Sequence, residues 1–237
     1  MYKPFLFLIL GLSLLFVSCS ARISGTIHEN GSADLSIQAS LEPKTAALLQ
    51  SFSPNSGDFS IDSASIGASA SAAPGVSSAQ FVNINPTSID GTIKIEKIDD
   101  FLLTSESSID AYRFIQYEQN AEEGSLSINV DLTKGPIIIS LFSPDVADYL
   151  SAIMAPLATG EVLSVAEYLD LVSTIYGSTV SNEIKNAIVN IDLVVPGTIQ
   201  SVKGGTFVNN RAHFSVPLTE LLVLETPVSY EIAWNNL

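Results

Sequence analysis

The chain has few of the residues from which catalytic and metal sites are built: one cysteine and two histidines among 237 residues. A single cysteine excludes an intramolecular disulfide, so an apolar core must stabilise the fold. His28 and His213 each stand beside an apolar residue in an alternating run, which predicts solvent-facing positions. The sequence also lacks a P-loop, a dinucleotide-binding glycine motif and a Gly-x-Ser-x-Gly elbow. We therefore expect no catalytic residues, no cofactor and no metal site, and hence no enzyme activity.

Basic residues are scarce as well, because ten lysines and arginines stand against 25 aspartates and glutamates, for a net charge of -15. Such a surface repels phosphate groups, so we expect no nucleic acid partner. The paired acids at residues 99–100 and 122–123 lack the spacing of a calcium loop, and we interpret them as solvated.

The N-terminus is the most informative segment. Lys3 precedes an apolar run over residues 5–17, which ends at Ser18 and Cys19. This order is typical of a secretion signal, and the run is shorter than the roughly 20 residues that a bilayer-spanning helix needs. Residues 16–19, Phe-Val-Ser-Cys, are similar to the processing box of bacterial lipoproteins, although Phe16 replaces the usual leucine. We predict a lipoprotein signal peptide at residues 1–18 and acylation, with palmitate or a similar chain, at Cys19.

Cleavage at this point would leave a single domain over residues 19–237. The alternative is an ordinary secreted protein with one leftover thiol. An acylated Cys19 would make the membrane the first partner, through the N-terminal lipid anchor. Ser20 is not an acidic retention signal, which favours the outer membrane of the bacterial cell envelope over the inner one.

Alternating apolar residues predict strands in the first half of the chain. Residues 23–27 and 35–41 alternate on either side of Asn30-Gly31, a strong hairpin signal. Residues 92–96 and 125–132 alternate in the same way, and residues 111–118 are strand-like in composition. Between them, residues 43–52 predict a short helix, while residues 53–78 contain nine serines, five alanines and three glycines. We expect this Ser/Ala/Gly-rich stretch to be a flexible insertion.

Helical spacing takes over in the middle of the chain. Pro144 follows a serine and precedes an acid, which predicts a helix over residues 144–154. Ser164 and Glu167 form a capping box, and Gly177 stands where the helix should stop. A third short helix is expected over residues 181–187. Residues 143–187 are therefore predicted to form a helical layer.

The last fifty residues return to strands, with Pro196-Gly197 and Gly204-Gly205 as turns and a final alternating run that ends at Trp234. The predicted fold class is α+β: one antiparallel sheet formed by the N- and C-terminal strands and covered by the helical insertion.

The lipidated cysteine, the Asn30-Gly31 hairpin, the run Val195-Pro196-Gly197-Thr198-Ile199 and the terminal strand ending at Trp234 together resemble the LppM-type domain of bacterial lipoproteins. The resemblance covers residues 19–42 and 187–237. It rests on turn chemistry, it implies no assigned activity, and it transfers no functional residue.

Two functions follow as expectations. The first is a membrane-anchored envelope lipoprotein that acts non-enzymatically, through surface contacts with an envelope or host protein. The second is a carrier of a lipid or another hydrophobic ligand, with a pocket between sheet and helices. The candidate ligand-binding residues are aromatic: Tyr112, Tyr149, Tyr168, Tyr176 and Trp234. Aromatic residues are also common in ordinary cores, which is the alternative interpretation of this set.

Overall fold

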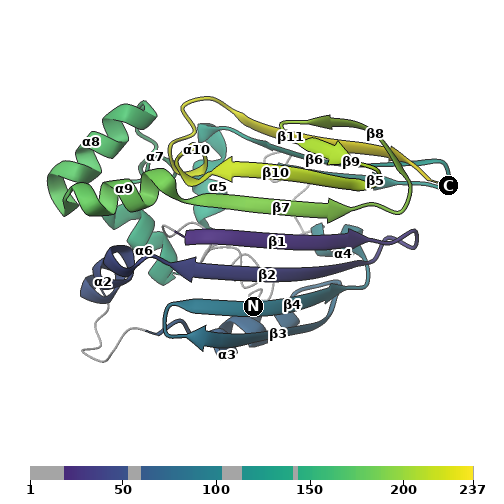
Figure 1. Ribbon diagram of the computed structural model, residues 1–237, viewed down its shortest axis with the longest axis horizontal. Helices are drawn as coiled ribbons and strands as arrows, with labels where there is room; N and C mark the ends of the chain where they lie inside the picture. Colours follow the sequence, from purple (N-terminus) through teal and green to yellow (C-terminus); the bar gives the residue numbers. More distant parts are fainter. Residues whose placement is uncertain (1–18, 53–59, 103–113, 141–143, 237) are drawn as a thin grey trace.

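The computed structural model describes residues 19–52, 60–102, 114–140 and 144–236, and it confirms the α+β class (Figure 1). The larger sheet, sheet A, has seven strands. In spatial order they are β3 (Val76–Asn85), β4 (Ser88–Ile95), β2 (Ala33–Leu41), β1 (Cys19–Ile27), β7 (Ile188–Val194), β10 (Arg211–Pro217) and β9 (Thr206–Val208).

The predicted first hairpin is present. Strands β1 and β2 pair antiparallel from Cys19 opposite Leu41 to Ile27 opposite Ala33. In the turn, Asn30 Oδ1 accepts hydrogen bonds from the backbone nitrogen and the hydroxyl of Ser32, at 3.1 and 2.7 Å. Gly31 takes a φ of +76°, a conformation that suits glycine. The turn chemistry thus fixes the register of the central strands.

Sheet A is mixed, whereas we expected an antiparallel sheet. The N- and C-terminal halves of the chain meet at β1 and β7, which run parallel, with Ala21 opposite Val189 and Thr26 opposite Val194. Parallel neighbours require a long crossover connection, and here the chain between β2 and β7 supplies it through helices, strands β3 and β4, and two strands of a second sheet.

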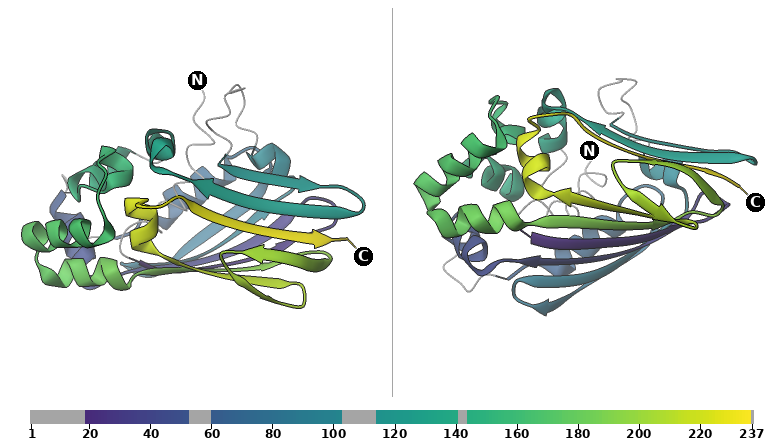
Figure 2. Two further views of the ribbon diagram at one scale, coloured as in Figure 1. Left: turned by 90° about the horizontal axis from the view of Figure 1, so that it is seen from above. Right: turned by 45° about the horizontal axis from the view of Figure 1, so that its top comes forward.

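The second sheet, sheet B, was not predicted as a separate layer. Its order is β5 (Ile115–Gln119), β6 (Glu123–Val130), β11 (Val228–Asn235) and β8 (Thr198–Lys203). Figure 2 shows the two sheets as two layers. Phe214 of β10 meets Tyr230 of β11 edge to face, with ring centroids 5.6 Å apart. The core therefore lies between the sheets, and sheet A turns its other face to solvent.

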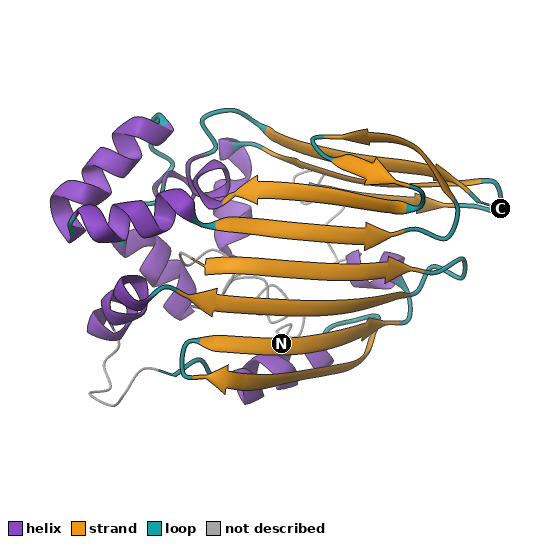
Figure 3. Cartoon of the chain, viewed as in Figure 1, coloured by secondary structure: helices purple, strands orange, loops and turns teal. Residues whose placement is uncertain are grey.

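The predicted helices form, but most of them gather at one end of the strands instead of covering a face (Figure 3). Ser164 and Glu167 make the predicted capping box at the start of α8. At this end lie α2 (Pro43–Phe52), α6 (Pro144–Ala152), α7 (Pro156–Thr159), α8 (Val165–Tyr176), α9 (Ser178–Asn186) and α10 (Leu218–Val223). Helix α5 (Gly135–Ser140), which follows a 3-10 turn at Leu132–Lys134, also lies near this end and contacts α7. The remaining helices are α3 (Ser63–Ser71) and α4 (Ile98–Leu102).

The prediction of a flexible insertion over residues 53–78 is wrong for residues 60–78. Residues 53–59 lie outside the described part of the chain. Helix α3 and the start of β3 occupy residues 63–78. Asp62 caps α3 by accepting a hydrogen bond from Ser65 N at 2.9 Å. Ser71 Oγ lies 3.2 Å from both the nitrogen and the oxygen of Ala79, and so satisfies the backbone of an edge strand. Small residues are abundant because α3 approaches β3 closely: a Cβ on Gly67 would stand 3.6 Å from Phe81 N.

Substitution in α3 tests this close packing. Ala70 has no exposed surface, whereas Ala68 on the same helix is exposed. We expect Ala70→Leu to lower the free energy of unfolding by about 1–3 kcal/mol through overpacking. The matched variant Ala68→Leu should change it by less than about 0.5 kcal/mol. Urea denaturation of both variants measures the difference, and equal values would contradict the packing of α3.

Candidate functional site

The surface around the first residue of β1 is the best candidate site. Cys19 starts β1 near the middle of sheet A, because β1 lies between β2 and β7. The helical end of the molecule is adjacent: β2 runs directly into α2, and α9 runs directly into β7. The sequence therefore places its predicted acylation site where α2, α9 and two neighbouring strands converge.

Two shallow depressions flank this point, and Ser20 lines both. The first, of about 340 Å³, lies among the start of α2, helix α9 and β1. Apart from Ala187, the residues that line it have polar or charged side chains: Ser20, Glu42, Thr179, Asn182, Glu183 and Asn186. The second, of about 380 Å³, extends over β1, β2 and the β3–β4 hairpin, and includes Arg22, Asp90 and Ile84. Neither is the closed apolar pocket that a lipid carrier would need.

Glu183 holds the elements of this surface together. Its carboxylate accepts hydrogen bonds from the backbone nitrogens of Lys44 and Thr45, at 3.2 and 2.8 Å, and from Thr45 Oγ1 at 2.9 Å. These donors lie in the first turn of α2, so Glu183 of α9 acts as a cap supplied by another helix. Thr45 has no exposed surface. Sequence reasoning missed this contact, because residues 138 positions apart carry no local signal.

The predicted aromatic residues are not brought together. Tyr149 lies in α6 and Tyr168 and Tyr176 lie in α8, at the helical end, whereas Trp234 lies near the end of β11. Figure 1 shows that this end of β11, next to the C-terminus, is opposite α8. Tyr149, Tyr168 and Trp234 are at most 2% exposed and belong to the core. Tyr112 lies outside the described residues, so a ligand-binding role for the set stays a prediction.

Trp234, near the end of β11, closes the end of the core that lies away from α8 and α9. Its ring centroid stands 6.4 Å from that of Tyr117, and Nε1 donates a hydrogen bond to Asn236 Oδ1 at 3.1 Å. The Tyr117 hydroxyl is hydrogen-bonded to Gln119, whose Nε2 in turn donates to the Glu29 carbonyl at 2.7 Å. Burial, aided by Asp99, raises the pKa of Tyr117 to about 12. These contacts join sheet B to the β1–β2 turn.

Removal of the hydroxyl group is expected to have different effects on stability at the two tyrosines of α8. Tyr176 donates to the Ala152 carbonyl at 2.5 Å, whereas the buried Tyr168 hydroxyl has no hydrogen-bond partner in the described chain. Burial raises the pKa of Tyr168. We expect Tyr176→Phe to cost about 1 kcal/mol and Tyr168→Phe to cost nothing or to stabilise the protein. Thermal and urea denaturation measure both variants, and a clear loss in Tyr168→Phe would contradict an unsatisfied hydroxyl.

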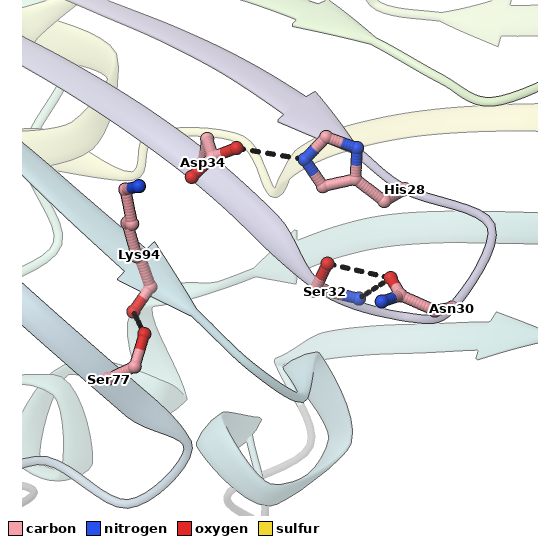
Figure 4. A network of polar contacts seen from close by, with 6 residues as sticks. All are labelled: His28, Asn30, Ser32, Asp34, Ser77 and Lys94. Carbon is pink, nitrogen blue, oxygen red and sulfur yellow. Dashed lines mark hydrogen bonds and ion pairs between the residues drawn. The ribbon is translucent and has the colours of Figure 1, made fainter.

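Both histidines pair with aspartates on the solvent face of sheet A. His28 Nε2 lies 2.9 Å from Asp34 Oδ2, in the hairpin shown in Figure 4. His213 Nδ1 lies 3.2 Å from Asp192 Oδ1. Figure 4 also shows Ser77 Oγ donating to the Lys94 carbonyl, at 3.3 Å. Among the hydrogen bonds of the described residues, neither imidazole is linked to a serine or threonine hydroxyl.

In the described ranges, three or more histidine, cysteine or acidic side chains do not converge as a metal site would require. Across the same ranges, no helix combines the length and apolar character needed to cross a bilayer.

Comparison with known proteins gives one structural similarity. No protein family matches the chain, and neither does any curated protein. Among solved structures, the chain is similar to the NMR structure of the folded domain of LppM from Mycobacterium tuberculosis. The TM-score is 0.43 at 12% sequence identity, over 92% of this chain and 90% of that one.

Proposed function

We propose that the chain is a bacterial envelope lipoprotein, held on a membrane by acyl groups on Cys19, that acts non-enzymatically through contacts of its surface. The observation that carries the proposal is the position of Cys19 in the fold. Among the described residues, strand β1 begins at Cys19. Cleavage before this residue would therefore remove no part of any described element, and it would expose the one cysteine of the chain as the new N-terminus.

The exposed surface supports a role in contacts. Sheet A presents a solvent-facing side over seven strands, in which polar residues of β1 such as Arg22 alternate with buried ones such as Ala21 and Ile23. The partner in this proposal is an envelope or host protein. The net charge of -15 disfavours nucleic acid. Ser20 directly after the anchor supports the outer membrane as the location.

Expression of the full chain in a diderm bacterium tests the proposal. We expect label from radioactive palmitate in the protein, recovery in the membrane fraction, and the mass of residues 19–237 plus acyl groups. Cys19→Ser should abolish the label and membrane retention, because no other cysteine is available. Ser20→Ala is the matched control and should keep both. Ser20→Asp should move the protein to the inner membrane, and an unlabelled wild-type protein would contradict the proposal.

A further inference from the structure

The distance between the acylation site and the folded domain decides how the protein would stand on a membrane. Cys19 pairs with Leu41 in the sheet, and two residues later Ala21 is only 2% exposed and pairs with both Ala39 and Val189. No spacer therefore separates residue 19 from the sheet. Acyl chains on Cys19 would hold the start of β1 at the level of the lipid headgroups, and they would bring its neighbours there too.

The charge of these neighbours suits such a contact. In the segments that flank Cys19, the turn into α2 and helix α9 with the start of β7, the charged residues are Glu42, Lys44, Glu183 and Lys185. Two acids and two bases cancel, although the whole chain carries a net charge of -15. This part of the surface thus avoids the repulsion that the remaining acidic surface would meet at anionic headgroups.

Exposed apolar side chains stand on both sides of Cys19. Ile188, the first residue of β7 on one side, is 37% exposed. On the other side, Ile84 of β3 is 66% exposed and lines the same depression as Ser20. Transfer of such exposed apolar side chains from water into the interfacial region of a bilayer lowers the free energy.

We propose that this surface, formed by the start of β1, the turn from β2 into α2, the end of β3 with Ile84, the end of α9 and the start of β7, docks on the lipid bilayer that holds the acyl chains. We call it the anchor end. Its polar depression, with Glu42 and Glu183, then faces the headgroups, and the strands point away from the membrane. The inference rests on the proposed acylation of Cys19.

The geometry also supplies a control position far from the membrane. Val208 is 73% exposed. It pairs with Arg211, Arg211 pairs with Val194, and Val194 pairs with Thr26, so Val208 is level with Thr26 across sheet A. Thr26 lies seven residues along β1 from Cys19, which is about 23 Å at 3.3 Å per residue. A label at Val208 should therefore remain in water when the anchor end touches lipid.

Depth measurement on the full acylated chain tests the inference. Single cysteines replace Asn186 or Glu42 at the anchor end, both exposed, or Val208 as the control, and each carries an environment-sensitive fluorophore. The protein is reconstituted in phosphatidylcholine vesicles that contain lipids spin-labelled near the headgroup. We expect quenching at Asn186→Cys and Glu42→Cys that is at least threefold stronger than at Val208→Cys.

The outcomes separate the docking inference from the proposed function. Mass spectrometry of each labelled sample reports acylation of Cys19. Acylated protein with equal quenching at all three positions, or with stronger quenching at Val208→Cys, overturns the docking and leaves the anchor intact. Protein without acyl groups overturns the proposed function, and the docking with it. A variant with Ile84→Ser and Ile188→Ser, two exposed positions, should reduce quenching at Asn186→Cys at least twofold while acylation is unchanged.

Discussion

Replacement of Trp234 by alanine is expected to lower the free energy of unfolding by about 3–5 kcal/mol, the usual cost of removing a large buried aromatic side chain. Trp234 is 1% exposed and packs beside Tyr117 between the sheets. Because it is the only tryptophan, unfolding in urea must be followed by circular dichroism instead of tryptophan fluorescence. A loss below about 1 kcal/mol would contradict its position in the core.

The close approach of Gly124 to Trp234 provides a second test of the same contact. These residues are opposite each other on β6 and β11, and a Cβ on Gly124 would stand 2.3 Å from Cζ2 of the tryptophan ring. We expect Gly124→Ala to destabilise the wild-type protein by about 1–3 kcal/mol through forced displacement of the ring. In a Trp234→Leu background the same substitution should cost much less. Equal costs in the two backgrounds would show that the ring is not the obstacle.

Replacement of Glu183 by alanine is the other large expected effect, a loss of about 2–3 kcal/mol in the free energy of unfolding. The substitution removes the carboxylate that caps α2, and it leaves the Thr45 nitrogen and hydroxyl without their acceptor. Because Thr45 is fully buried, water cannot replace the lost hydrogen bonds without local opening. Thermal and urea denaturation measure the loss.

Two further variants separate the capping role from a general effect of the surface. Asn182→Ala changes an exposed residue of the same depression and should cost less than about 0.5 kcal/mol. Thr45→Val removes one of the donors to Glu183 and should cost less than Glu183→Ala. If Asn182→Ala were as destabilising as Glu183→Ala, the loss could not be assigned to the cap.

Local sequence patterns predicted many of the elements. The Asn30-Gly31 turn predicted the β1–β2 hairpin, and Ser164 with Glu167 predicted the start of α8, because both signals act through hydrogen bonds within a few residues. Alternation predicted the terminal strand β11, whose buried residues Val228, Ile232 and Trp234 face the core. These patterns depend on the period of one element and need no knowledge of its neighbours.

Composition was misleading for helix α3, where tertiary packing against β3 requires small side chains. The Ser/Ala/Gly-rich stretch resembles a linker, yet Ser69 and Ala70 are buried in a helix against β3. A helix that lies this close to an edge strand requires small side chains, and composition alone cannot distinguish this requirement from the absence of a core. The aromatic set failed to converge for a related reason: helical and strand periods show which residues face inward, but not which end of the core they reach.

The sequence by itself determined the local elements, the acidic character of the chain and the cysteine that follows an apolar leader-like segment, because each depends on residues close together in the chain. The tertiary structure decided that β1 and β7 run parallel, that the strands divide into two sheets, and that Glu183 caps α2 from another helix. It also decided that Cys19 starts a central strand of sheet A instead of a tether. These features depend on contacts between segments that are distant in the chain, more than a hundred residues apart for the β1–β7 pairing and for Glu183 with α2. Such contacts are selected by the packing of the whole core and not by any local period.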